Sequence, residues 1–188
     1  MMKPSDEQLA ELTLKDKKNF NPLVNKYAPK IRVFIARIIG NWQEAEDLTQ
    51  ETFFRAYRGI ASFNPKLKFS SWLYRIAHNQ AVNYIKKNYR FKTVEFSEEI
   101  KNKFFEEKDI LETVYEKENA EEIKKALFKL NSSSREILEL AFFEEKSYLE
   151  IADILEISVN SVGPNIKRAK DKLKHILEEK HGKFNRKN

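Results

Sequence analysis

The chain contains no cysteine, only four glycines and only five prolines among its 188 residues. Without cysteine it can form neither disulfide bonds nor thiolate metal sites. No apolar run approaches the roughly 18 residues that span a bilayer, and the polar opening stretch MMKPSDEQLAEL lacks the apolar centre of a signal peptide. These absences point to a cytoplasmic protein. The scarcity of glycine, proline and β-branched runs favours an all-α fold.

Charge is unevenly distributed along the chain, although the net charge is only +6. Residues 1–90 carry 16 basic and 8 acidic side chains, residues 91–122 carry 5 and 11, and residues 123–188 carry 14 and 10. Two basic segments therefore flank an acidic one. Basic segments favour a polyanionic partner, and solvated helix faces would give the same totals. Charge alone leaves both interpretations open.

Helical signals begin near the N-terminus. Three serines have Glu or Gln three residues on, the capping-box pattern that opens a helix: Ser5 with Gln8, Ser133 with Glu136, and Ser147 with Glu150. Apolar residues recur at helical spacing over residues 20–38, and Pro29 predicts a break or kink near Ala28. Gly40 suits a helix end, and Asn41 suits the start of the next helix.

A helix predicted over residues 42–58 has one apolar and one polar side. Its inward positions are small or apolar: Ala45, Leu48, Thr52, Ala56 and Tyr57. Its outward positions are mixed in charge: Glu46, Asp47, Gln50, Glu51 and Arg55. Residues 59–70 then read as a loop, because Gly59 and Asn64-Pro65 are turn signals.

The stretch KFSSWLYRIAHNQAVNYIKK, residues 68–87, mixes aromatic and basic side chains on a helix capped by Ser70 or Ser71. One stripe of this helix joins Trp72, Arg75, Asn79, Asn83 and Lys86, with His78 beside it. The loop before it adds Phe63, Asn64, Lys66, Lys68 and Phe69. Aromatic rings stack on unpaired bases, amides bond base edges and cations neutralise phosphates, so this surface suits single-stranded nucleic acid. Each aromatic taken singly is more typical of a core.

Residues 91–118 are acidic and aperiodic, which predicts a linker between two small helical domains, 1–90 and 119–188. In the C-terminal domain, helices over 148–155 and roughly 160–178 form a helix-turn-helix pattern. Glu156 lies in the turn where glycine is common, so a left-handed conformation there costs about 1 kcal/mol. Since proline is tolerated only in a first turn, Pro164 predicts that the second helix begins nearer Ser161 than Val159.

The outward face of that second helix is polar and basic. Its candidate DNA-binding residues are Asn160, Ser161, Asn165, Lys167, Arg168 and Lys172. Side chains near the start of such a helix meet base edges, and Lys and Arg meet phosphates. A helical hairpin with a solvated basic face would show the same pattern.

Three segments taken in order resemble an RNA polymerase sigma factor of the extracytoplasmic-function (ECF) subfamily: AEDLTQETFFRAYR, FSSWLYRIAHNQAVNYI and SSSREILELAFFEEKSYLEIADILEISVNSV. Residues 20–90 resemble region two of these proteins and residues 120–178 resemble region four. Two departures are the glycine missing at Glu156 and the absence of a basic residue near Gly163 or Asn165. The second departure shifts the expected DNA contacts toward Lys167 and Arg168.

The resemblance implies a set of roles and partners. Asp47, Gln50, Glu51 and Arg55 would dock on the clamp helices of the largest subunit of core RNA polymerase. Residues 63–87 would open the promoter at the −10 element and hold the melted non-template strand. The helix-turn-helix would read the −35 element as duplex and touch the flap of the second-largest subunit. The resemblance also implies an anti-sigma factor as a partner, no catalytic residue and no cofactor.

Two other functions are weighed against this one. A stand-alone helix-turn-helix regulator would bind its operator without polymerase. A helical metal-dependent hydrolase would use Glu46, Asp47 and Glu51 near His78, but these carboxylates share one helix and lack a second ligand pair. We therefore expect neither a metal site nor enzymatic chemistry.

Overall fold

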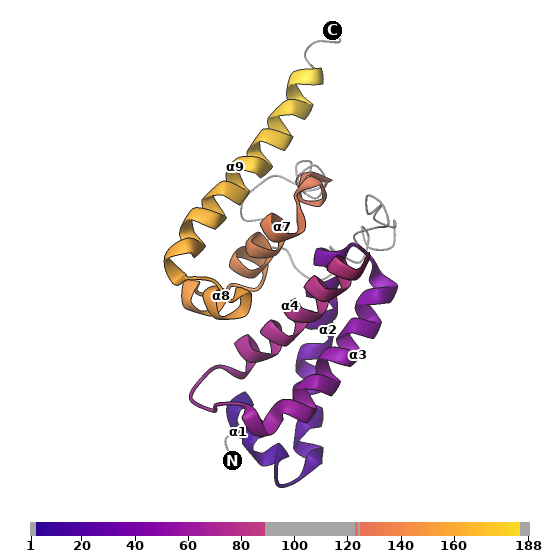
Figure 1. Ribbon diagram of the computed structural model, residues 1–188, viewed down its shortest axis with the longest axis vertical. Helices are drawn as coiled ribbons and strands as arrows, with labels where there is room; N and C mark the ends of the chain where they lie inside the picture. Colours follow the sequence, from indigo (N-terminus) through magenta and orange to yellow (C-terminus); the bar gives the residue numbers. More distant parts are fainter. Residues whose placement is uncertain (1–2, 89–122, 124, 185–188) are drawn as a thin grey trace. The chain divides into compact units, whose positions relative to one another are not determined.

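The computed structural model describes residues 3–88, 123 and 125–184 (Figure 1). Every regular element in these ranges is a helix. They belong to two compact units, the first built mainly from residues up to 88 and the second mainly from residues after 122. The prediction of an all-α fold with two domains is confirmed. The predicted linker, 91–118, and both of its boundaries lie outside the described residues.

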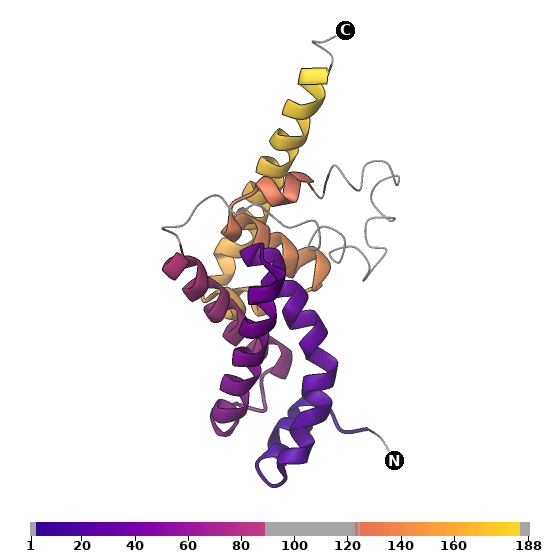
Figure 2. The same ribbon diagram turned by 90° about the vertical axis from the view of Figure 1, so that its right-hand side faces the viewer.

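The N-terminal unit is a helical bundle. Its described helices are α1 (Asp6–Thr13), η1 (Lys17–Phe20), α2 (Asn21–Ile39), α3 (Trp42–Gly59), η2 (Ile60–Ser62) and α4 (Phe69–Asn88). Helices α2, α3 and α4 pack on one another in pairs, as both views show (Figures 1 and 2). The core lies among them: the rings of Phe34 and Tyr74, both fully buried, have centroids 5.0 Å apart.

The predicted caps of this unit are present. Ser5 and Gln8 form a capping box, in which the Ser5 N–H donates to Gln8 Oε1 at 2.8 Å and the Gln8 N–H donates to Ser5 Oγ at 3.2 Å. Gly40 ends α2 with φ 74°, a left-handed conformation that glycine adopts without strain. Asn41 then caps α3 by accepting from the Glu44 N–H at 3.2 Å. Helix α3 matches the predicted range to within one residue.

Helix α2 does not break at Pro29, so that part of the prediction is wrong. Proline cannot donate to the carbonyl four residues earlier, which here belongs to Asn25. Both Pro29 and Asn25 are exposed, so water is available to the freed carbonyl. The helix therefore continues to Ile39 and carries core residues on both sides of the proline.

The C-terminal unit contains α7 (Ser132–Leu138), η4 (Glu139–Phe143), α8 (Tyr148–Leu155) and α9 (Val159–Phe184) among its described elements. Residues 125–129 are also helical. The predicted start of α7 is wrong by two residues, because Asn131 rather than Ser133 is the cap and accepts from the Ser134 N–H at 2.9 Å. Asparagine satisfies the same unpaired N–H groups as serine, and sequence spacing alone does not choose between them.

A buried arginine joins two elements of this unit. Arg135 donates to three backbone carbonyl groups, those of Leu127 at 3.2 Å, Phe128 at 3.0 Å and Leu130 at 2.8 Å. These carbonyls close the helix before α7, where the last four lack partners within the helix. Burial lowers the pKa of Arg135 to about 10, so the side chain remains charged at neutral pH.

The helix-turn-helix begins at the predicted capping box. The Ser147 N–H donates to Glu150 Oε2 at 2.9 Å, and the Glu150 N–H donates to Ser147 Oγ at 3.3 Å. Helix α8 covers the predicted 148–155. In the turn, Glu156 has φ 55°, a left-handed conformation that is costly for a residue with a Cβ. Val162, on α9 just after the turn, is fully buried.

Helix α9 begins at Val159, not near Ser161, so this prediction is wrong. Pro164 lies inside the helix, and the carbonyl that it leaves unpaired belongs to Asn160, which is exposed to water. The helix also runs to Phe184, beyond the predicted end at 178, and its last turns extend past the other helices of its unit in both views (Figures 1 and 2). Among the described residues, no helix is long and apolar enough to cross a membrane.

Candidate functional site

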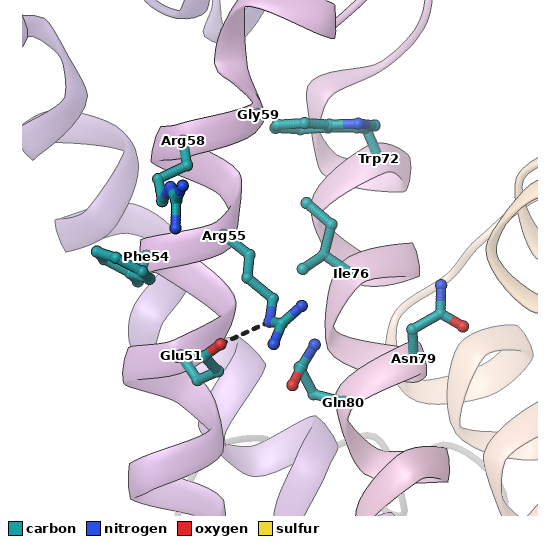
Figure 3. Close-up of a pocket in the computed structure, with 9 residues that line it drawn as sticks. All are labelled: Glu51, Phe54, Arg55, Arg58, Gly59, Trp72, Ile76, Asn79 and Gln80. Atoms are coloured by element: carbon teal, nitrogen blue, oxygen red, sulfur yellow. Dashed lines mark hydrogen bonds and ion pairs between the residues drawn. The ribbon is translucent and has the colours of Figure 1, made fainter.

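A cleft of about 470 Å³ lies between α3 and α4 (Figure 3). Its lining residues come from the outward face of α3 and one stripe of α4: Glu51, Phe54, Arg55, Arg58, Gly59, Trp72, Ile76, Asn79 and Gln80. Two groups that the sequence predicts separately therefore meet here. Glu51 and Arg55 come from the predicted polymerase-binding set, and Trp72 and Asn79 come from the predicted DNA-binding set.

Trp72 forms one end of the cleft and rests on buried aromatic rings. Its ring centroid lies 5.3 Å from that of Phe63 and 5.7 Å from that of Phe69. Phe63 is 8% exposed and Phe69 is fully buried, whereas Trp72 is half-buried. All three rings are predicted from the sequence to lie on the DNA-binding surface. For Phe63 and Phe69 this is corrected, because their rings belong to the core and support Trp72 from beneath.

The other predicted −10 residues come from the loop before α4 and from α4 itself. Asn64 and Lys66 are exposed in the preceding loop, where the Lys66 N–H donates to Asn64 Oδ1 at 3.0 Å and makes the predicted turn. Further along α4, Asn83 and Lys86 are exposed. Arg75 and His78 also lie on α4, between Trp72 and these residues. The loop and α4 thus supply the predicted polar and cationic groups, and Trp72 lies on the same helix.

On α3 the predicted polymerase-binding residues form one polar face. Asp47 and Gln50 are exposed. In the next turn of the helix, Arg55 Nε donates to Glu51 Oε1 at 2.6 Å, and the two side chains form an ion pair (Figure 3). An i, i+4 pair of this kind orders two side chains that would otherwise be mobile. Phe54, beside this face, is 54% exposed.

Sequence reasoning missed Phe54 and Arg58, which contribute to the cleft. The Arg58 guanidinium lies 5.6 Å from the centroid of the Phe54 ring, a cation–π contact that holds both side chains at the surface. A signal was present in the sequence: Phe53 and Phe54 are adjacent, and neighbouring positions on a helix point about 100° apart. Only Phe53 is buried, so Phe54 faces outward.

The second candidate surface is the start of α9. Of the predicted −35 residues, Asn160, Lys167, Arg168 and Lys172 are exposed, and Ser161 and Asn165 are half-buried. The Arg168 guanidinium donates to Asn165 Oδ1, which orients the guanidinium on the helix surface. Lys172 Nζ lies 3.5 Å from Ser134 Oγ on α7, so its ammonium group is drawn toward that helix.

Sequence reasoning also missed an apolar rim beside this surface. Tyr148, Leu149 and Val159 are 53%, 72% and 38% exposed, respectively, although they open α8 and α9. A Cβ built on Gly163 would lie 3.4 Å from Tyr148 Cε2, so the tyrosine ring approaches α9 closely at its glycine. Exposed large apolar side chains at the starts of α8 and α9 distinguish this surface from a simple solvated basic face.

Each of the two units matches a known protein family. Residues 23–91 match the Sigma-70 region 2 family, and residues 120–173 match the Sigma-70, region 4 family. The first match contains the cleft between α3 and α4, and the second contains the helix-turn-helix. The match across two families in this order agrees with the resemblance found in the sequence.

Individual relatives match over nearly the full chain. The ECF RNA polymerase sigma factor SigW of Bacillus subtilis is 33% identical, over 87% of this chain and 91% of its own length. The RNA polymerase sigma-H factor of Pseudomonas aeruginosa is 34% identical, over 92% of this chain and 94% of its own.

Solved structures show the same fold. CnrH, solved in complex with the cytosolic domain of CnrY, is similar with a TM-score of 0.67 at 26% identity, covering 93% of this chain and 97% of that one. The sigma factor RpoE of Bartonella quintana, solved with the anti-sigma factor NepR, has a TM-score of 0.68 at 22% identity, covering 86% of this chain and 98% of that one. From its region 2 and region 4 matches and from these relatives, the chain belongs to the extracytoplasmic-function (ECF) family of RNA polymerase sigma factors.

Proposed function

We propose that the cleft between α3 and α4 captures the melted non-template strand at the −10 element. The observation that carries this proposal is the setting of Trp72: a half-buried ring, supported by two buried phenylalanines, at one end of a cleft that Asn79 also lines. A rigid aromatic face stacks on an unpaired base at little entropic cost, and an amide bonds its edge. Six further residues of the preceding loop and of α4 supply amides, an imidazole and cations: Asn64, Lys66, Arg75, His78, Asn83 and Lys86.

The polar face of α3 is the proposed contact with the clamp helices of the largest polymerase subunit. Asp47, Gln50, Glu51 and Arg55 offer both signs of charge on one exposed helix face, which suits the polar part of a protein interface. Since Glu51 and Arg55 also line the cleft, polymerase binding and strand capture would take place at adjoining surfaces.

The start of α9 is the proposed reader of the −35 element as duplex. Asn160, Ser161 and Asn165 lie in its first two turns, where side chains of a recognition helix meet base edges. Lys167, Arg168 and Lys172 follow and would hold phosphates or guanine edges. The exposed apolar rim at Tyr148 and Leu149 gives the same unit a surface for the flap of the second-largest subunit.

Core polymerase would hold both units on one promoter, so that two weak DNA sites act together through effective concentration. In this proposal residues 1–90 and 119–188 are the two DNA-binding domains, and the linker of residues 91–118 would thread toward the RNA channel of the polymerase.

Sigma factors are not a family of enzymes, and the protein would act in the cytoplasm beside polymerase and DNA. An anti-sigma factor would cover the polymerase-binding face, in keeping with a relative solved in complex with the cytosolic domain of another protein.

A gel shift with and without core polymerase tests the proposal against a stand-alone helix-turn-helix regulator. We expect specific promoter binding only when core polymerase is present, and weak, strongly salt-dependent DNA binding by the chain alone. Promoters for the test come from genome-wide mapping of run-off start sites with the reconstituted holoenzyme. Tight, sequence-specific binding by the chain alone would favour the regulator instead.

A further inference from the structure

One hydrogen bond ties the first turn of α1 to the first residue of α4. Glu7 Oε1 accepts from the backbone N–H of Phe69 at 3.1 Å, across 62 residues of sequence. The N–H groups at the start of a helix have no partner within the helix, and the helix dipole favours a negative charge there. Glu7 therefore satisfies an N–H group of α4 from a different element and fixes where α4 begins.

Asp6 anchors the same turn of α1 on α2. Its Oδ2 accepts from the Tyr27 hydroxyl at 2.5 Å and from Lys26 Nζ at 2.6 Å. Tyr27 is buried, and its ring centroid lies 5.9 Å from that of Phe69. Two adjacent carboxylates thus hold α1 in place. Glu7 bonds the backbone of Phe69 directly, and Asp6 bonds Tyr27, whose ring packs near that of Phe69.

Phe69 in turn supports the ring that faces the cleft. Its centroid lies 5.6 Å from that of Phe63 and 5.7 Å from that of Trp72, and the Phe63 and Trp72 rings are 5.3 Å apart. The three rings form one packed cluster in which only Trp72 reaches the surface. A shift of the Phe69 backbone would therefore be transmitted to Trp72, because a close-packed cluster does not absorb displacement.

We propose that Glu7 is a positioning residue for capture of the melted strand. By holding the start of α4, it sets the orientation of Trp72 and of the loop between Phe63 and Phe69. The proposal rests on the function assigned above to the cleft. It predicts that loss of Glu7 weakens strand capture while leaving the α3 face, and hence binding to core polymerase, unchanged.

Tryptophan fluorescence reports this positioning directly. The chain has two tryptophans, so a Trp42→Phe background leaves Trp72 as the single emitter. In that background we compare Glu7→Ala with Glu7→Gln, which keeps an acceptor oxygen without the charge. Glu11→Ala is the matched control, because Glu11 is an exposed glutamate on the same helix. We expect red-shifted, more readily quenched Trp72 emission in Glu7→Ala, a smaller change in Glu7→Gln and none in Glu11→Ala.

Holoenzyme binding to a single-stranded −10 oligonucleotide provides the functional readout. We expect about tenfold weaker binding for Glu7→Ala, in line with the loss of a charge-assisted hydrogen bond and the displacement of a binding group. Affinity for core polymerase should stay within about twofold of the wild-type value. If Glu7→Ala fails to fold, Glu7→Gln tests the proposal in its place, by Trp72 fluorescence and by oligonucleotide binding.

The outcomes separate this inference from the function on which it rests. If Glu7 serves stability alone, its variants melt at lower temperature but show wild-type Trp72 emission and wild-type DNA binding below that temperature, and the inference is overturned. If the wild-type holoenzyme itself does not bind the oligonucleotide, the proposed function falls and the inference falls with it. If the wild-type protein binds and Glu7→Ala binds equally well, only the inference is wrong.

Discussion

Trp72 lies directly against Gly59: a Cβ built on that glycine would be 3.6 Å from Cζ2 of the indole ring. Gly59 is the last residue of α3 and Trp72 lies in the first turn of α4, so this contact joins the two helices where the chain passes from one to the other. The proposed polymerase-binding helix and the proposed strand-capturing helix thus meet at the tryptophan. Variants on either side of this contact separate the two activities.

Charge reversal on the α3 face should weaken binding to core polymerase. Asp47 is exposed on the proposed interface. Asp47→Arg removes any attraction between this carboxylate and basic groups of the polymerase and replaces it with repulsion. We expect a loss of about 1 kcal/mol, the usual scale for a charge at the edge of an interface. Fluorescence anisotropy with labelled core polymerase measures the affinity.

Glu11→Arg is the control for this prediction, because Glu11 is exposed on α1, outside the polar face of α3. Equal losses from Asp47→Arg and Glu11→Arg would mean that overall charge, rather than this face, governs the affinity.

Removal of Arg168 should weaken recognition of the −35 element. If its guanidinium bonds a guanine edge, Arg168→Ala costs about 1–3 kcal/mol on the cognate sequence. The variant should lose less on a sequence changed at the contacted base pair. Holoenzyme titrations on the two duplexes measure this difference.

Lys174→Ala provides the comparison, since Lys174 is exposed on α9 and its Nζ lies 3.6 Å from Glu178 Oε1. A uniform loss for Arg168→Ala across both duplexes would show that Arg168 contacts a phosphate and reads no base.

The turn of the helix-turn-helix should become more stable when Glu156 is replaced by glycine. Glu156 has φ 55°, which strains a residue with a Cβ by about 1 kcal/mol. Glycine relieves this strain but adds freedom to the unfolded chain, which offsets at least about 0.4 kcal/mol, so we expect a net gain of no more than about 0.5 kcal/mol. Urea denaturation gives the free energy of unfolding. Glu156→Ala, which keeps the Cβ, should show no gain, and an equal gain from alanine would refute the strain argument.

Stability at high pH should depend on Tyr27. Burial, and secondarily the hydrogen bond to Asp6, raises the pKa of the Tyr27 hydroxyl above its ordinary value. The unfolded chain then loses this proton at a lower pH than the folded chain, so the stabilisation is complete below about pH 10 and is lost as the pH rises further. The free energy of unfolding should fall above about pH 10, and Tyr27→Phe should reduce that fall. Denaturation curves of both proteins at pH 8–11 test this, and equal slopes would contradict it.

Local signals in the sequence were sufficient where a few neighbouring residues determine the structure. The serine capping boxes at Ser5 and Ser147, the left-handed Gly40 and the cap at Asn41 depend on contacts three or four residues apart, and each was predicted.

Features that depend on tertiary surroundings were not predictable in this way. The two prolines inside α2 and α9 leave unpaired the carbonyls of Asn25 and Asn160, which are exposed residues, and a sequence does not show this exposure. Phe69 and Trp72 are three residues apart on one helix, and only packing decides that the first is core and the second lines a cleft. The bond between Glu7 and Phe69 joins residues 62 positions apart and has no local signature.

Permanganate footprinting of the reconstituted holoenzyme on a mapped promoter tests most directly whether the α3–α4 cleft holds melted DNA. With the wild-type chain, thymines around the −10 element should become reactive. With Trp72→Ala, this reactivity should fall by about tenfold, while protection of the −35 duplex is retained, and Trp72→Phe should recover part of the reactivity. Full reactivity with Trp72→Ala would contradict the assignment of strand capture to this cleft.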